Sequence, residues 1–194
     1  MEQIRSFIAI ELSEEIKTGL KQIQDRLKSA DPSIAKWVDP QSIHLTLKFL
    51  GNVPADRIPV VLQAMYDAAV TASSFTLKID RLGCFPSPKS PRVVWVGLTG
   101  DLERLQALQK NTELYVAPLG FPTEKRPFAP HLTLARVREH ATSLQRQALG
   151  ELIAETQINT NLCLQVNSFD LMRSQLTPSG AIYTRLRTIQ LNSA

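Results

Sequence analysis

The chain has 194 residues, of which 43% are hydrophobic and 21% are charged, and its formal net charge at pH 7 is +4. This length suits one compact domain or two small lobes with a substantial core, and no apolar run approaches the roughly 20 residues of a membrane span. Residues 1–5 lead into no signal-peptide pattern, so we predict a cytoplasmic location. The small basic excess favours a polyanionic partner without establishing one.

Strands and helices are predicted to alternate along the chain. Apolar β-prone runs predict strands, and apolar residues at steps of three and four predict helices. The predicted strands are 6–12, 43–50, 75–82, 92–98, 131–137, 158–169 and 181–191, with a turn at 177–180 before the last. The predicted helices begin after Ser13 as N-cap, at Pro54–Pro59 and after Asp101 as a further cap, and the last helix carries Leu144, Ala148, Leu149, Leu152 and Ile153. Proline-rich loops are predicted at 83–91 and 118–130, and no glycine-rich or Walker phosphate loop occurs.

Cysteine and histidine are scarce, with two and three residues respectively. Cys84 and Cys163 are far apart and belong to no CxxC pair, so we interpret both as reduced thiols. No His-rich tract and no clustered ligand set is present. We therefore predict no zinc site and no cofactor.

The tetrapeptide HLTL occurs twice, at 44–47 and 131–134, 87 positions apart (131 minus 44). Each copy lies in an apolar, strand-like segment that a helix follows, and a repeat at nearly half the chain length suggests two similar lobes. Side chains alternate faces along a strand, so the His and Thr of each copy point one way and the leucines the other. Two such strands related by a pseudo-twofold axis would present facing His-Thr sets.

Two facing histidines suit acid-base chemistry on a phosphoester. One imidazole must be neutral to accept a proton and the other protonated to donate one, and histidine does both near neutrality. The hydroxyls of Thr46 and Thr133 can donate hydrogen bonds to phosphate oxygens as negative charge develops. A single histidine on a strand is more often structural, so the hypothesis depends on the duplication, which uses His44 and His131. The third histidine, His140, is expected to be solvated.

Further motifs surround both tetrapeptides: Arg5–Ile10, Trp37, His44–Gly51, Phe85–Pro86, Pro91–Gly97, Pro127–Arg136 and Ser174–Ala181. With them the chain resembles the two-histidine (2H) phosphoesterases, specifically the RNA 2',3'-cyclic phosphodiesterases, also named 2'-5' RNA ligases. The resemblance covers nearly the whole chain.

The resemblance implies an α+β fold over residues 1–194. Two pseudo-symmetric lobes, each an antiparallel sheet with helices on its outer face, would enclose an active-site cleft. It also implies metal-independent hydrolysis of a terminal 2',3'-cyclic phosphate to a 2'-phosphate, and in some members reversible, ATP-independent 2'-5' ligation. His44 would be the proton donor and His131 the proton acceptor. The partners would be RNA ends or nucleoside 2',3'-cyclic phosphates, and we expect a monomer.

Two residues beyond the tetrapeptides are candidate substrate contacts. Arg136 resembles the family's arginine after the second motif, a phosphate contact, but strict alternation from His131 requires a bulge or strand end to turn it inward. Phe49 could stack on an unpaired base. Alternation puts Phe49 with Leu45 and Leu47, so the core is its favoured interpretation.

Four cations lie on or beside the proline-rich loops and could guide an RNA backbone, although solvated loop charge is the more ordinary interpretation. They are Lys89, Arg92, Lys125 and Arg126.

Three other functions remain open. A 2H exonuclease or another cyclic-nucleotide phosphodiesterase would use the same histidines on a different phosphodiester. A non-catalytic RNA- or nucleotide-binding module would retain the cleft without turnover. A metal-dependent hydrolase is disfavoured, because two His with hydroxyl neighbours and no adjacent carboxylate make a weak divalent site.

Overall fold

Two antiparallel sheets organise the chain in the computed structural model, which describes residues 2–29, 31–158, 161–178 and 180–193. The four-stranded sheet has the order β3-β1-β8-β9. Its strands are β1 (Gln3–Glu11), β3 (His44–Pro54), β8 (Ser168–Thr177) and β9 (Gly180–Gln190). The five-stranded sheet has the order β2-β6-β5-β4-β7. Its strands are β2 (Ala35–Trp37), β4 (Phe75–Phe85), β5 (Val93–Gly100), β6 (His131–Val137) and β7 (Cys163–Val166).

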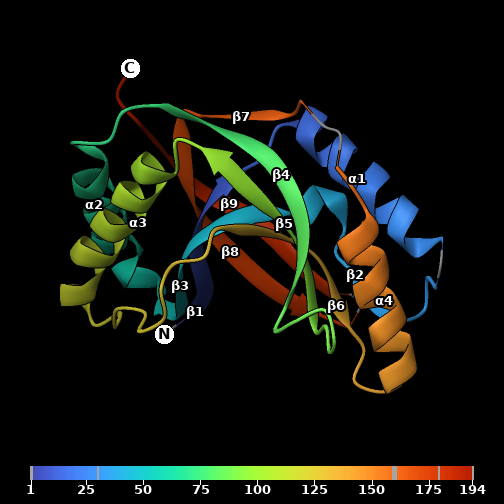
Figure 1. The fold of residues 1–194 in the computed structure, drawn as a ribbon. Coiled ribbons are helices and arrows are strands. Elements are labelled where there is room, and N and C mark those ends of the chain that lie inside the picture. Colours follow the sequence, from blue (N-terminus) through green and yellow to red (C-terminus); the bar gives the residue numbers. More distant parts are fainter. Residues whose placement is uncertain (1, 30, 159–160, 179, 194) are drawn as a thin grey trace.

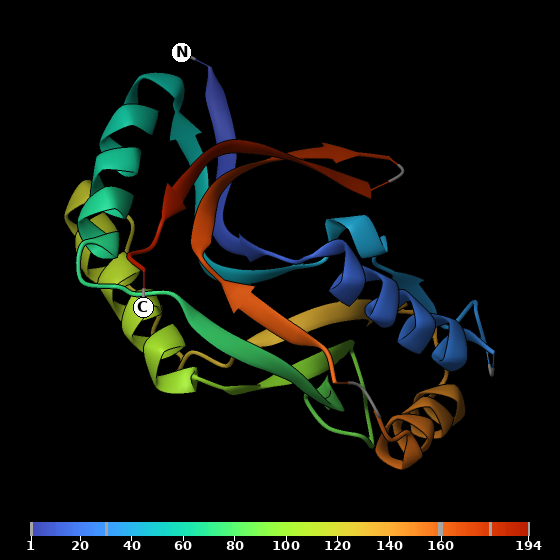
Figure 2. The same cartoon turned by 90° about the horizontal axis from the view of Figure 1, so that it is seen from above.

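The helices form two pairs at opposite ends of the molecule (Figures 1 and 2). The pair α2 (Ile58–Ala69) and α3 (Leu102–Val116) packs together at one end, and α1 (Glu14–Lys28) lies beside α4 (Ser143–Glu155) at the other. No helix in the described part of the chain is both long and apolar enough to cross a bilayer.

The two sheets repeat one arrangement. The order β3-β1-β8 in the first sheet corresponds to β6-β5-β4 in the second, and the chain orders β1-α1-β3-α2 and β5-α3-β6-α4 correspond as well. The predicted pseudo-symmetry and α+β class are therefore confirmed. Neither lobe is a continuous half of the chain, because each sheet takes strands from both halves.

Each lobe also supplies a helix to the other. Helix α1 follows β1 of the four-stranded sheet, yet its buried Gln24 donates from Nε2 to the carbonyl of Leu134 in β6, at 2.9 Å. Helix α3 follows β5 of the five-stranded sheet, yet its Glu113 pairs with Lys48 of β3 at 2.7 Å. These reciprocal contacts hold the two motif strands to helices from the opposite lobe.

Helix starts agree with the sequence in one case and differ in another. The Ser13 hydroxyl accepts a hydrogen bond from the Ile16 N–H, so its predicted N-cap role is confirmed. Asp101 occupies the predicted N-cap position of α3, but its side chain makes no capping hydrogen bond. Its Oδ2 accepts a hydrogen bond from the Thr76 N–H, 2.9 Å away, and therefore joins the start of β4 to the start of α3.

The predicted strand 158–169 is the largest error in the fold, and part of it (159–160) lies outside the described residues. The chain changes sheets at Asn167: β7 pairs with β4, and β8 then pairs with β1. Most of β8 was not predicted as a strand, and β2 was not predicted at all. Strand β4 also continues to Phe85, three residues into a predicted loop, because these residues pair with β5. Of the predicted turn at 177–180, Ser179 lies outside the described residues.

The Lys48–Glu113 ion pair is buried, with side chains 6% and 12% exposed, and Lys48 also donates to the Pro122 carbonyl. Replacing Glu113 with Leu leaves an uncompensated ammonium, so we expect a loss of about 3 kcal/mol in the free energy of unfolding, measured with urea. The double change Lys48→Met and Glu113→Leu should recover most of this loss. Removing the exposed pair Lys21–Asp25 by Lys21→Ala is the control, expected to cost less than about 1 kcal/mol. Equal losses in the two single variants would contradict the prediction.

Candidate active site

The duplicated tetrapeptides open strands β3 and β6. The four leucines are fully buried, whereas both histidines and both threonines are only half-buried, so each strand has the predicted polar face. Although β3 and β6 belong to different sheets, their Cα atoms approach within 8 Å, and both views show them side by side near the centre of the molecule (Figures 1 and 2). The fold therefore brings the two motifs together from positions 87 residues apart.

A β-bulge follows the threonine in each motif. Ala9 pairs with Thr46 and Ile8 with Lys48, which leaves Leu47 as the extra residue on β3. In β6, the pairing passes from Thr133 to Ala135 and leaves Leu134 extra. Because one inserted residue reverses the alternation, the positions after each bulge change face.

The bulges decide the placement of both further candidates. Phe49 is 71% exposed and Arg136 is exposed, at equivalent positions five residues after His44 and His131. The interpretation of Phe49 as a core residue is therefore wrong, because the bulge at Leu47 turns it away from the leucine face. The bulge expected for Arg136 is present.

Both imidazoles are held through the same nitrogen. Nδ1 of His44 lies 2.9 Å from the Ser42 carbonyl, and Nδ1 of His131 lies 2.7 Å from the Ala129 carbonyl. Because a carbonyl only accepts, each Nδ1 carries the proton and donates it. Within the described residues no hydrogen bond is made by either Nε2, so each Nε2 is available to exchange a proton with a ligand.

Aromatic rings fix the histidine side chains further. The His44 ring lies 4.7 Å from the ring of Phe7 and 5.0 Å from that of Tyr183, which meets it edge-on. Phe7 also lies 6.2 Å from Phe49, so an aromatic row runs along this side of the sheet. These contacts limit rotation of the His44 imidazole about its side-chain bonds.

His131 has its own aromatic supports. Phe85 meets its ring edge-on at 5.2 Å, and Trp95 lies at 6.4 Å. The Trp95 indole covers Gly83, where a Cβ atom would come within 2.3 Å of the ring, and it also lies against Gly97. Gly83 is therefore required for the indole to support His131.

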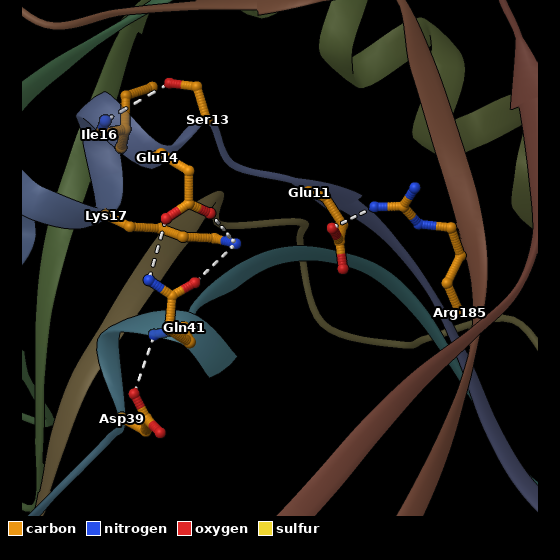
Figure 3. A network of polar contacts seen from close by, with 8 residues as sticks. All are labelled: Glu11, Ser13, Glu14, Ile16, Lys17, Asp39, Gln41 and Arg185. Atoms are coloured by element: carbon orange, nitrogen blue, oxygen red, sulfur yellow. Dashed lines mark hydrogen bonds and ion pairs between the residues drawn. The ribbon is translucent and has the colours of Figure 1, made fainter.

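A charged network adjoins His44. Glu11 stands directly opposite His44 in the β1–β3 pair, and its carboxylate forms an ion pair with Arg185 of β9 (Figure 3). Arg185 also contacts the buried Asp170, which accepts a hydrogen bond from Thr188. Burial raises the pKa of Asp170, and the hydrogen bond to Glu11 raises the pKa of Arg185.

A second network fixes the turn before β3. Lys17 of α1 donates to Glu14 and to the Gln41 side chain, and Gln41 donates to Glu14 in return (Figure 3). Gln41 belongs to the short 3-10 helix Pro40–Ser42, whose last carbonyl binds the His44 imidazole. Helix α1 therefore positions that carbonyl.

The four loop cations are all exposed. Lys125 and Arg126, with Phe49, line a groove of about 560 Å³ between residues 48–51 and 121–126. Lys89 and Arg92 lie on or beside the other proline-rich loop and are not part of this groove. His140 is exposed, as predicted.

Sequence analysis did not single out Glu11, Arg185 or Tyr183. Glu11 lies at the end of β1 and Arg185 lies within β9, and neither belongs to a recognisable motif. Their proximity to His44 follows from strand register and from the position of β9, which local patterns do not reveal.

Within the described ranges, no three His, Cys, Asp or Glu side chains lie close enough together to hold a metal ion. Cys84 and Cys163 are both free thiols, as predicted.

Comparison with known proteins agrees with the fold and the paired motifs. The family model described as LigT like Phosphoesterase matches residues 10–95 and 96–183. Two sheets that each contribute one HxT strand define the chain as a two-histidine phosphoesterase. It belongs to the LigT-like phosphoesterase family.

Curated relatives and solved structures match over nearly the whole chain. The RNA 2',3'-cyclic phosphodiesterase of Methanothermobacter thermautotrophicus is 35% identical, over 97% of this chain and 100% of that protein. The protein of the same name from Aquifex aeolicus is 32% identical over 95% of each. The structures of TT0787 from Thermus thermophilus and of E. coli LigT with 3'-AMP have TM-scores of 0.79 and 0.80, at 29% and 28% identity, and each comparison covers 98% of this chain and 99% of the other.

Burial lowers the pKa of His44 below 6.5, and the hydrogen bond to Ser42 and the charge of Glu11 oppose this only partly. As the pH falls below about 6.5, the unfolded chain takes up a proton that the folded chain resists. The free energy of unfolding should therefore fall, by at most about 1.4 kcal/mol per pH unit from this group. Chemical denaturation at pH values from 7.5 to 5.5 should show that the free energy of unfolding falls more steeply in the wild type than in His44→Gln. Parallel curves would contradict the burial of a neutral imidazole.

Proposed function

We propose that the protein hydrolyses a terminal 2',3'-cyclic phosphate of RNA to a 2'-phosphomonoester by general acid-base catalysis, without a metal ion. The observation that carries this proposal is the equivalence of the two histidines. Each opens an HLTL strand, donates from Nδ1 to the carbonyl two residues earlier, and leaves Nε2 available. Two such nitrogens, on strands of different sheets that approach within 8 Å between Cα atoms, suit a reaction that moves one proton in and one proton out.

In the proposed reaction, Nε2 of His131 takes a proton from a water molecule as its oxygen attacks phosphorus. The bond from phosphorus to the 3' oxygen breaks, and His44 gives its proton to that oxygen. The Thr46 and Thr133 hydroxyls donate hydrogen bonds to the non-bridging oxygens, where negative charge increases. One water is consumed, and proton exchange with solvent returns both histidines to their starting forms.

The acid role of His44 requires its protonated form, which burial opposes in the ligand-free protein. A bound phosphate carries a negative charge and favours a protonated imidazole beside it. We therefore assign His44 as the donor in the substrate complex, where phosphate and Glu11 act in the same direction.

Phe49 and Arg136 extend the proposed site in opposite ways. They occupy equivalent positions after the two bulges, but one offers an aromatic face and the other a guanidinium. Arg136 suits a phosphate oxygen, and the exposed Phe49 ring suits stacking on an unpaired base. The Lys125 and Arg126 side chains beside Phe49 suit the RNA backbone.

The relatives support this choice of substrate. Those that match over nearly the full chain are named RNA 2',3'-cyclic phosphodiesterase, and E. coli LigT has been crystallised with 3'-AMP, a nucleotide with its phosphate on the ribose 3' oxygen. A 5' hydroxyl of RNA in place of water would turn the same step into 2'-5' ligation without ATP, and we propose this as a second activity.

Removing either imidazole should lower kcat by roughly 10² to 10⁴, because each performs one of the two proton transfers. His44→Ala and His131→Ala are assayed on a nucleoside 2',3'-cyclic phosphate, with His140→Ala as the control that should keep wild-type turnover. The wild-type pH–rate profile should be bell-shaped. Full activity in both single variants would refute the mechanism.

Product analysis distinguishes the alternatives. An RNA oligonucleotide ending in a cyclic phosphate should yield a 2'-phosphate end and no shortening. Successive loss of nucleotides would indicate an exonuclease instead. Salt-sensitive RNA binding without any turnover would indicate a binding module.

Substitutions at Phe49 and Arg136 should weaken substrate binding more than they slow the chemical step. Phe49→Leu and Arg136→Gln should each raise KM by roughly 5- to 50-fold, the equivalent of about 1 to 2.3 kcal/mol of binding, with a smaller change in kcat. Phe49→Tyr retains a stacking ring and serves as the matched control, with KM close to that of the wild type. A KM unaffected by Phe49→Leu would remove this residue from the substrate site.

The proposed proton transfers need no Lewis acid. Activity on the cyclic phosphate should therefore be unchanged after dialysis against excess EDTA and on addition of Mg²⁺ or Mn²⁺. A loss with EDTA that one of these ions restores would overturn the metal-independent route.

A further inference from the structure

The two half-sites are equivalent in backbone but different in charge. In the β1–β3 pair Glu11 stands opposite His44, and in the β5–β6 pair Gly97 stands opposite His131. Directly opposite side chains in an antiparallel pair project from the same face, with Cβ atoms about 5 Å apart. His44 therefore has a carboxylate as its nearest cross-strand neighbour, and His131 has no side chain at that position.

Other groups near His44 leave Glu11 as the carboxylate that acts on it most directly. On β9, Tyr183 contacts the imidazole, and Arg185 binds Glu11. On β8, Asp170 is buried and shares Arg185.

The remaining charges around His44 lie on α1 and the preceding turn, and across on β6. Lys17 and Glu14 pair with each other, and Asp39 accepts a hydrogen bond from the backbone of Gln41. Strand β6 approaches β3 within 8 Å between Cα atoms, and the titratable or charged side chains on its polar face are His131 and Arg136. None of the charges on α1 or the turn stands opposite His44 in a strand pair.

We propose that Glu11 is the positioning residue that makes His44, rather than His131, the histidine that donates a proton to the departing oxygen. This inference rests on the proposed function and adds the reason why two near-identical motifs take different roles. A carboxylate beside an imidazole favours its charged form, and Glu11 supplies this effect on one side of the duplicated site only.

Arg185 limits the effect. Its guanidinium pairs with Glu11 and contacts Asp170, so its positive charge cancels part of the field that the Glu11 carboxylate exerts on His44. Removing Glu11 and removing Arg185 should therefore shift the proton affinity of His44 in opposite directions. A residue that merely supported the fold would not produce shifts of opposite sign.

The experiment compares Glu11→Gln, Arg185→Gln and the wild type by two readouts. The first is the pH profile of kcat/KM on a nucleoside 2',3'-cyclic phosphate, whose two limbs report the pKa values of the acid and the base in the free enzyme. The second is NMR titration of the His44 and His131 imidazoles in the ligand-free protein. Glu2→Gln is the control, since Glu2 immediately precedes β1, at the end away from Glu11, and pairs with Arg173.

We expect Glu11→Gln to move the His44 titration, and the limb of the kcat/KM profile that coincides with it, to lower pH by roughly 0.5 unit. Arg185→Gln should move both to higher pH by a similar amount, and Glu2→Gln should move neither. If Glu11→Gln does not fold, the sign of the Arg185→Gln shift still decides the matter.

Three results would overturn the inference: equal profiles in Glu11→Gln and Glu2→Gln, a larger shift at His131 than at His44, or shifts of the same sign in both variants. The NMR titration requires no turnover. A protein inactive on cyclic phosphates that shows the expected titration shifts would refute the proposed function separately from the influence of Glu11.

Discussion

The paired β-bulges are the constraint on which the rest of the site depends. A regular strand that placed His and Thr on one face would place the fifth residue after the histidine on the other. One extra residue, Leu47 in β3 and Leu134 in β6, lets each strand bury two consecutive residues after its threonine. The next residue, Phe49 or Arg136, then returns to the polar face. The Leu134 carbonyl that this irregularity exposes is satisfied by Gln24 of α1 and by the Val38 N–H. Local backbone geometry and lobe packing therefore depend on each other.

The sequence predicted what depends on local pattern or duplication. The amphipathic helix after Ser13, the strand His131–Val137 and the paired motifs all have strong local signals. The change of sheet at Asn167 was missed because an apolar run has the same appearance whether it pairs in one sheet or two. Phe49 was misplaced for a related reason, since alternation holds only while the register is unbroken. Recognising Glu11 and Arg185 as neighbours of the first histidine required knowledge of the strand register, which no local window of sequence contains.

Duplication supplies two equivalent histidines, which we propose as the proton-transfer groups, and their surroundings make them different. Around His44 the neighbours are Phe7, Tyr183 and a carboxylate, whereas around His131 they are Phe85 and an indole that needs Gly83. A symmetric site would have no preferred direction for a reaction whose two proton transfers differ. The differences lie on neighbouring strands and not in the motifs, so the motifs remain alike while the surroundings of their histidines differ.

The pairing of β1 with β8 has a consequence for how the molecule is made. Ser6 lies opposite Arg173, 167 positions later (173 minus 6). Strand β1, the first to be synthesised, therefore cannot complete its pairing until β8 has been synthesised near the end of the chain. The five-stranded sheet lacks only the short edge strand β7 once β6 has emerged, but the four-stranded sheet cannot close until β8 and β9 are available. Such distant pairing slows folding and leaves strand edges uncovered in the meantime. A nascent chain would thus complete the surroundings of His131 well before those of His44, and truncation near the C-terminus would harm the first histidine more than the second.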